Sequence, residues 1–191
     1  MRSTSLRLRQ AQLVTALALV AVLGLATVAS AATGGASAPA ETAPVAPTVP
    51  GKKAKLLKSG KAVAPASAPQ EVKDAIEAAN SIRKKPYIYG GGHRSFKAKG
   101  YDCSGAVSYV LNAAGLLDSP LPSGSLMKWG RPGLGTWITV YAHGGHTYAV
   151  IAGLRWDTSA VNEPFNSGSG PRWRASKRSP KGYAVRHAVG Y

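Results

Sequence analysis

The hydrophobic pattern of the chain changes near Gly115, and this change limits the folds that residues 69–191 can adopt. Before Gly115, apolar residues recur every three or four positions, which places them on one face of a helix. After it, short β-branched and aromatic runs are separated by turn residues, as is typical of strands. Helices followed by strands predict an α+β domain, with helices packed on an antiparallel β-sheet. A unit of about 123 residues is a normal size for one domain.

Two helices are expected in the first half of this domain. One begins at Pro69, because proline fits the first turn of a helix, and carries an apolar stripe over residues 72–82 before Pro86 ends it. The other runs from Cys103 to Ala114, where Gly115 supplies the left-handed residue that stops it.

Strands are expected in the second half wherever β-branched and aromatic residues gather between turn residues. The four expected strands are Trp137–Tyr141, Thr147–Ala152, Leu154–Thr158 and Gly182–Ala188. The stretches Leu126–Gly135 and Asn162–Pro180 are interpreted as surface loops.

Residues 1–31 have the features of a secretory signal peptide. Met1–Gln10 carries three arginines and no acid, an uncharged apolar run follows from Leu13 to Val28, and Ala29-Ser30-Ala31 forms a small-x-small cleavage pattern. The run of about sixteen residues is short for a membrane span of roughly 20. We therefore expect cleavage after Ala31, secretion to the cell wall or beyond it, and no stable membrane span after cleavage. An uncleaved membrane anchor is the alternative.

Residues 32–68 are rich in Ala, Pro, Thr, Ser and Gly and are interpreted as a disordered basic linker. Within them, Gly51–Lys61 contains five lysines, and the formal net charge of +16 falls to +13 when the three arginines of the signal peptide are removed. In an exported protein this surplus favours anionic wall polymers or lipid headgroups as partners, with a merely solvated linker as the alternative. Nucleic acid is not expected, because no aromatic-and-basic reading module is present.

Cys103 is the one cysteine of the chain, so no disulfide can form within it. An odd thiol in an exported protein indicates an intermolecular link or a reactive group. Asp102 is a good N-cap, which makes Cys103 the first residue of its helix, where the dipole and the unpaired amides favour a thiolate. Gly105 is expected to clear space for a substrate carbonyl. We interpret Cys103 as a nucleophile, and a small buried apolar residue is the alternative.

A cysteine nucleophile needs a base, which is usually histidine. His146 leads directly into an apolar strand that would hold its ring, so we expect it to be the base, with His143 as the alternative. His93 and His187 are interpreted as structural or surface residues.

Asp157 is the expected third group, which orients the imidazole. If a two- or four-residue turn lies at Gly153, residues that face each other across the hairpin have numbers with an odd sum. Such residues share a face of the sheet, so Asp157 falls on the face of His146. The alternative is an ordinary exposed acid at a strand end.

These residues together form a recognisable pattern. It consists of Pro86-Tyr87-Ile88-Tyr89-Gly90-Gly91, Asp102-Cys103-Ser104-Gly105 followed by Val107 and Tyr109-Val110, Leu121-Pro122 with Ser125, and Gly145-His146. Residues 70–160 thereby resemble the NlpC-type family of papain-like cell-wall cysteine peptidases.

The resemblance implies a papain-like α+β fold and thiol hydrolysis of peptidoglycan stem peptides, commonly at the bond from the γ-carboxyl of D-glutamate to a diamino acid. It implies that Cys103 is the nucleophile, His146 the base and Tyr87 the tyrosine beside the site, with Asp102 and Ser104 contacting a substrate amine. It implies no cofactor and no metal. The family's third residue is most often histidine, sometimes Asn or Gln, whereas Asp157 stands here.

Two alternatives to a peptidoglycan endopeptidase remain open. A cell-wall amidase or acyltransferase would use the same Cys–His pair. A non-catalytic wall-binding protein would use only the basic surface.

Overall fold

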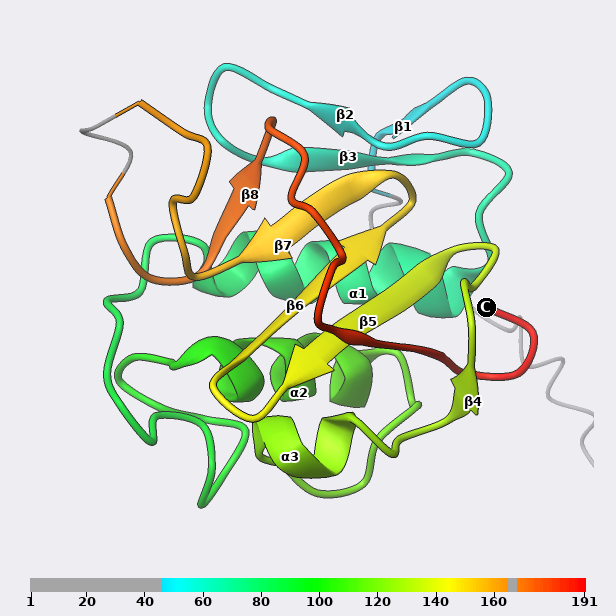
Figure 1. Cartoon of the computed structure of the whole chain (residues 1–191). Helices are drawn as coiled ribbons and strands as arrows, with labels where there is room; N and C mark the ends of the chain where they lie inside the picture. Colours follow the sequence, from blue (N-terminus) through cyan, green and yellow to red (C-terminus); the bar gives the residue numbers. More distant parts are fainter. Residues whose placement is uncertain (1–45, 165–167) are drawn as a thin grey trace, which may run out of the picture. The chain divides into compact units, whose positions relative to one another are not determined.

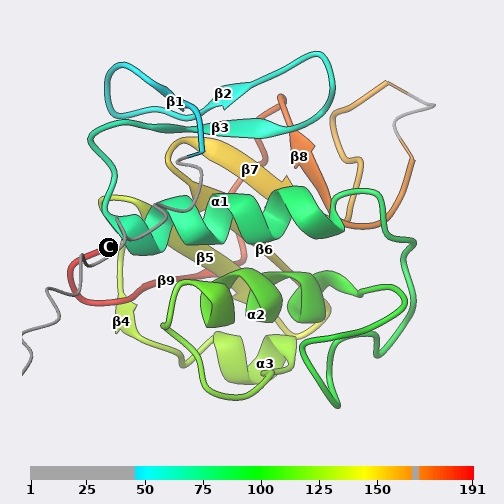
Figure 2. The same ribbon diagram turned by 180° about the vertical axis from the view of Figure 1, so that it is seen from behind.

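The structure is a computed structural model of the chain and describes residues 46–164 and 168–191. Two helices, α1 (Gln70–Ile82) and α2 (Cys103–Ala113), cover one face of a six-stranded antiparallel sheet (Figures 1 and 2). The expected α+β fold, with helices packed on an antiparallel sheet, is therefore confirmed.

The six strands follow the order β4-β9-β5-β6-β7-β8 across the sheet. They are β4 (Arg131–Pro132), β5 (Ile138–His143), β6 (His146–Ile151), β7 (Leu154–Asp157), β8 (Arg172–Arg174) and β9 (Ala184–His187). Two tight turns shape the centre of the sheet, because His143 pairs with His146 across one hairpin and Ile151 with Leu154 across the next. The four expected strands correspond to β5, β6, β7 and β9, with ends shifted by one or two residues.

Both expected helices form where the sequence places them. The apolar stripe of α1 is buried as a set: Val72, Ala75, Ile76, Ala79 and Ile82. Helix α2 ends at Ala113, and Gly115, two residues later, has a φ of 66°, the left-handed conformation expected after the helix. A short helix, α3 (Ser123–Leu126), was not expected; it follows Pro122 and lies against β5 and β6.

Trp156 connects the sheet to α2 and so fixes the frame of the site. Its side chain is fully buried, its indole N–H donates to the backbone oxygen of Ala106 at 3.1 Å, and its ring packs on Trp173 of β8. Because Ala106 lies in the first turns of α2, this contact holds the start of the helix against β7.

The prediction of a disordered linker over residues 32–68 is wrong for its second half. Residues 46–68 contain β1 (Thr48–Val49), β2 (Lys55–Leu56) and β3 (Ala62–Pro65), and the folded unit includes them. The side-chain amide of Asn80, on α1, pairs with both the N–H and the C=O of Ala62 at 2.8 Å. Because small alanines let β3 approach α1 closely, a segment with few bulky apolar residues is nevertheless ordered (Figure 2).

The interpretation of residues 162–180 as a surface loop also needs correction. Strand β8 lies inside it, with Trp173 and Arg174 buried, and residues 175–183 then cross the sheet on the face opposite the helices (Figure 1). The other expected loop, 126–135, contains the end of α3 and β4. The expected signal peptide and the first part of the linker, up to residue 45, lie outside the described residues. No helix in the described residues is long and apolar enough to cross a membrane.

Candidate active site

The start of α2 holds the expected nucleophile. Asp102 caps the helix by accepting the Gly105 N–H at 2.8 Å, so Cys103 occupies the first turn as predicted. Cys103 is buried, with 8% of its surface exposed. Its contacts are nevertheless polar: Sγ lies 3.7 Å from Oγ of Ser123, and it is hydrogen-bonded to His146 and to the Thr147 amide.

His146 and Asp157 are brought together by the hairpin of β6 and β7. Ala149 pairs with Trp156 across this hairpin, so paired residue numbers add to an odd sum. His146 and Asp157, whose numbers also add to an odd sum, therefore share a face of the sheet, as the parity argument predicted. His146 Nε2 lies 2.8 Å from Oδ1 of Asp157, whose side chain is fully buried. This leaves Nδ1 as the ring nitrogen that can exchange a proton with Cys103.

Electrostatics in this group favour a thiolate beside an imidazolium. Burial raises the pKa of Cys103, but hydrogen bonds from His146 and Ser123 outweigh burial, so this pKa lies below its ordinary value. Burial lowers the pKa of His146, but its hydrogen bonds to Asp157 and Cys103 and their charges raise it to about 9. Both shifts place the proton of the pair on His146, which is the reactive arrangement for a cysteine nucleophile.

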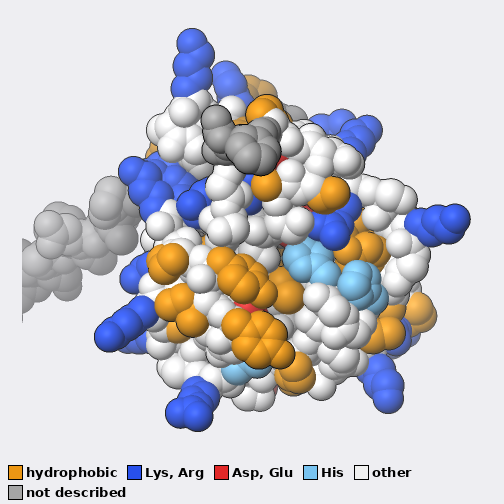
Figure 3. Space-filling model, turned by 60° about the vertical axis from the view of Figure 1, so that its left-hand side comes forward, with side chains coloured by type: hydrophobic (Ala, Val, Ile, Leu, Met, Phe, Trp, Pro, Cys, Tyr) orange, Lys and Arg blue, Asp and Glu red, His pale blue; other side chains and the backbone are white. Residues whose placement is uncertain are grey.

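A cavity of about 280 Å³ opens over Cys103. It is lined by Tyr87, Tyr89, Gly90, His93, Asp102, Cys103, Ser104, Pro122, Ser123, Gly124, Gly144 and Gly145. The surface view turned from Figure 1 shows histidine side chains beside a group of hydrophobic ones, with Lys and Arg projecting around the edge (Figure 3). Tyr87 is 43% and Tyr89 91% exposed, so both rings are accessible to a ligand.

Asp102 and Ser104 are placed at the site as expected, but both already have partners within the protein. Asp102 accepts the Gly90 N–H at 3.0 Å on one oxygen and the Gly105 N–H on the other. His93 lies within 3.1 Å of both the Asp102 carboxylate and the Ser104 hydroxyl. His93 therefore belongs to the site, which the sequence interpretation as a structural or surface residue did not anticipate.

Asp102→Asn should lower stability more than the loss of a charge at an ordinary N-cap would. An amide offers one oxygen, so its NH₂ group would face either the part-buried N–H of Gly90 or the buried N–H of Gly105, and one of these donors would lose its acceptor. We expect a cost of about 1–3 kcal/mol, measured as a lower midpoint in urea unfolding. Asp118→Asn, which changes an exposed carboxylate, is the control. Equal midpoints for both variants would reduce Asp102 to a simple cap.

Gly105 does not open space for a substrate carbonyl, contrary to our expectation. A Cβ on it would lie 2.0 Å from the backbone oxygen of Gly91, so Gly105 faces the glycine-rich loop and not the cavity. Close packing of two backbones is the reason for glycine at this position.

Ser123 is a further contact of Cys103 that was not predicted from the sequence, although it directly follows Leu121-Pro122 of the NlpC-type pattern. Among the described residues, no group of three or more His, Cys, Asp or Glu could hold a metal ion.

Comparisons with known proteins bear on the fold. No protein-family model and no curated protein matches the sequence. Among solved structures, the chain is similar to the peptidoglycan hydrolase RipB from Mycobacterium tuberculosis, with 23% identity over 64% of this chain and 66% of RipB and a TM-score of 0.50. It is also similar to RipD from M. tuberculosis, a non-catalytic NlpC/p60 domain protein, with 19% identity over 64% of this chain and 100% of RipD and a TM-score of 0.46. The chain thus spans just under two thirds of the length of RipB, and the NlpC-type resemblance is confirmed at the level of the fold.

Proposed function

We propose that the chain is a secreted peptidoglycan hydrolase that cleaves stem peptides by a thiol mechanism. The observation that carries the proposal is the line Cys103–His146–Asp157, in which the buried carboxylate contacts the imidazole at 2.8 Å and both pKa shifts favour the ion pair. The fold shared with RipB, a peptidoglycan hydrolase, supports the wall as the location of the substrate.

In this mechanism, the thiolate of Cys103 attacks the carbonyl carbon of a peptide bond, and the amides of the first turn of α2 stabilise the oxyanion. The His146 imidazolium then donates its proton to the leaving amine, and a thioester remains on Cys103. His146 next takes a proton from water, which attacks the thioester and releases the acid. Asp157 accepts the Nε2–H throughout and so keeps Nδ1 directed at the sulfur.

For the substrate, we propose the bond between the γ-carboxyl of D-glutamate and a diamino acid. The support is the resemblance of Asp102-Cys103-Ser104-Gly105 and of Tyr87 to the NlpC-type motifs, together with the cavity that these residues line. Asp102 already accepts two backbone N–H groups. A substrate amine would therefore contact the hydrogen-bonded group of His93, Asp102 and Ser104 together, and not Asp102 alone.

Mass spectrometry of fragments released from purified peptidoglycan tests this proposal. New amino and carboxyl ends within the stem peptide identify an endopeptidase and the bond that it cuts. Release of whole stem peptides from the glycan would identify an amidase, and peptides joined to an added amine an acyltransferase. Binding to peptidoglycan with no released fragment would leave a non-catalytic wall-binding protein.

The lysines of residues 51–61 should contribute affinity for wall without contributing chemistry. All five are exposed although the segment is folded, and the stem of Lys53 lies beside Gly153. Replacing the other four by Gln (Lys52, Lys55, Lys58 and Lys61) should weaken sedimentation with intact wall mainly at low salt, because exposed charges are screened over about 8 Å at physiological ionic strength.

A matched variant removes the same charge at exposed lysines elsewhere: Lys84, Lys97, Lys128 and Lys181. It should bind wall more tightly than the first variant, and both should hydrolyse soluble fragments at the wild-type rate. Equal binding by the two variants would show that net charge alone matters, and not this segment.

A further inference from the structure

Asp157 carries a charge that its surroundings must compensate. Its side chain is fully buried, and a buried charge is costly unless it is paired and hydrogen-bonded. Its oxygens have separate partners: Oδ1 receives His146 and the Ser159 N–H, both at 2.8 Å, whereas Oδ2 lies beside two guanidinium groups. The orientation of Oδ1 toward the imidazole therefore depends on what holds Oδ2.

Arg178 is the closer of the two guanidinium groups. Its NH1 donates to Oδ2 at 3.1 Å, while Arg155 Nε lies at 3.5 Å without hydrogen-bond geometry and is shared with Glu163. Arg178 comes from residues 175–183, which cross the sheet on the face opposite the helices (Figure 1). The Arg178–Asp157 pair thus joins this crossing segment to the candidate active site.

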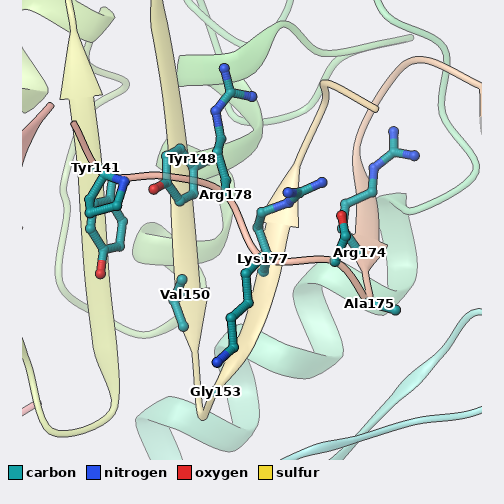
Figure 4. Close-up of a pocket in the computed structure, with 11 residues that line it drawn as sticks. Tyr141, Tyr148, Val150, Gly153, Arg174, Ala175, Lys177 and Arg178 are labelled. Atoms are coloured by element: carbon teal, nitrogen blue, oxygen red, sulfur yellow. The ribbon is translucent and has the colours of Figure 1, made fainter. Parts of the chain in front are cut away.

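Aromatic rings hold Arg178 in this position. Its guanidinium carbon lies 5.5 Å from the ring centroids of both Tyr148 and Tyr183, which meet edge to face. Figure 4 shows the side chain extending alongside Tyr148, whereas the neighbouring Lys177 extends the other way, toward the turn at Gly153. Two adjacent cations of the same segment therefore point in different directions, and only Arg178 reaches Asp157.

We propose that Arg178 is a positioning residue for the Cys103–His146–Asp157 line. From the C-terminal crossing segment it holds Oδ2 of Asp157, so that Oδ1 stays turned toward His146. The inference rests on the proposed thiol mechanism. Residues 175–183 were interpreted from the sequence as loop and strand. The inference gives them a direct part in building the site.

The sign of the effect on Cys103 follows from the charged and titratable groups around Asp157. These are His146 and Tyr148 from β6, Arg155 from β7, Arg174 from β8, and Arg178 and Tyr183 from the crossing segment. Removing the Arg178 charge takes a cation away from the thiolate, which raises the pKa of Cys103. An Asp157 that is no longer held toward His146 would stabilise the imidazolium less, and this raises the pKa of Cys103 further.

Alkylation of Cys103 by iodoacetamide at a series of pH values measures this directly, because the chain has one cysteine and no substrate is needed. For Arg178→Gln we expect the lower limb of the rate profile to move to higher pH, with about a threefold to tenfold slower reaction at pH 6, equivalent to half to one pKa unit. Arg178→Lys, which keeps the charge, should restore most of the wild-type limb. Lys177→Gln, which removes a cation that points away, should leave the profile unchanged.

The double variant Asp157→Asn/Arg178→Gln shows whether Arg178 acts through Asp157. It removes the buried carboxylate together with its closer guanidinium partner, and so serves as the second variant should Arg178→Gln alone fail to fold. Compared with the single variant Asp157→Asn, it should shift the limb little. A full shift on adding Arg178→Gln to Asp157→Asn, or equal shifts in Arg178→Gln and Lys177→Gln, would overturn the inference. A wild-type profile with no limb below the ordinary thiol range would instead remove the thiolate–imidazolium pair, and with it the proposed function.

Discussion

Cys103→Ala should abolish release of peptide fragments from peptidoglycan, with the rate falling on the order of 10³-fold or more. The variant has no nucleophile to form the thioester, so no tetrahedral intermediate forms for the helix amides to stabilise. Stability should change little. Cys103 is small, and its Sγ contacts polar groups, Ser123 and His146, which sit beside the cavity. The measurement is fragment release by mass spectrometry, with thermal unfolding of the same samples.

Binding separates loss of chemistry from loss of recognition. The Ala variant should still sediment with intact wall as the wild type does, because the exposed lysines and the tyrosines of the cavity are unchanged. A folded Cys103→Ala protein that releases fragments at a comparable rate would contradict the thiol mechanism. Ser123→Ala is the matched control, because it removes a second polar side chain that contacts Sγ, besides His146, and should lower activity only partly.

The parts of the site that could be predicted lie in local sequence patterns. A capping aspartate before an apolar helical run predicted the place of Cys103, and the capping bond to Gly105 is present. The turn at Gly153 predicted, through strand parity, that His146 and Asp157 share a face, and they lie in contact. These inferences need only the chain's own periodicity, because helix caps and hairpin registers are set by neighbouring residues.

The parts that were missed depend on contacts between distant residues. Strand β3 is held by Asn80, 18 positions away from Ala62, so nothing in the composition of residues 46–68 reveals that they are ordered. Arg178 contacts Asp157 across 21 positions and lies in a stretch with no strand or helix periodicity. His93 lies in a loop, and Ser123 begins the short helix α3, whose position local patterns do not determine. Gly105 was correctly singled out but for the wrong reason, since its neighbour is backbone and not substrate.

Gly105→Ala should therefore damage both fold and activity. The added Cβ would lie 2.0 Å from the oxygen of Gly91 and 3.1 Å from Cα of Gly92, and backbone cannot rotate away as a side chain can. Displacing this loop would break two bonds that hold the start of α2, from the Asp102 N–H to Gly91 and from the Gly90 N–H to Asp102. We expect a loss of about 1–3 kcal/mol or more in urea unfolding.

The same displacement should lower hydrolysis well beyond its effect on stability. Asp102 caps the helix that presents Cys103, and small shifts of a nucleophile relative to its base cost large factors in rate, as much as about 10²-fold for 1 Å. Gly124→Ala is the matched control, because Gly124 lines the same cavity but a Cβ there meets nothing within 4 Å. That variant should keep its unfolding midpoint. If Gly105→Ala kept wild-type stability and rate, the glycine-rich loop would have to be free to move away from α2, and its packing could not be what fixes the start of the helix.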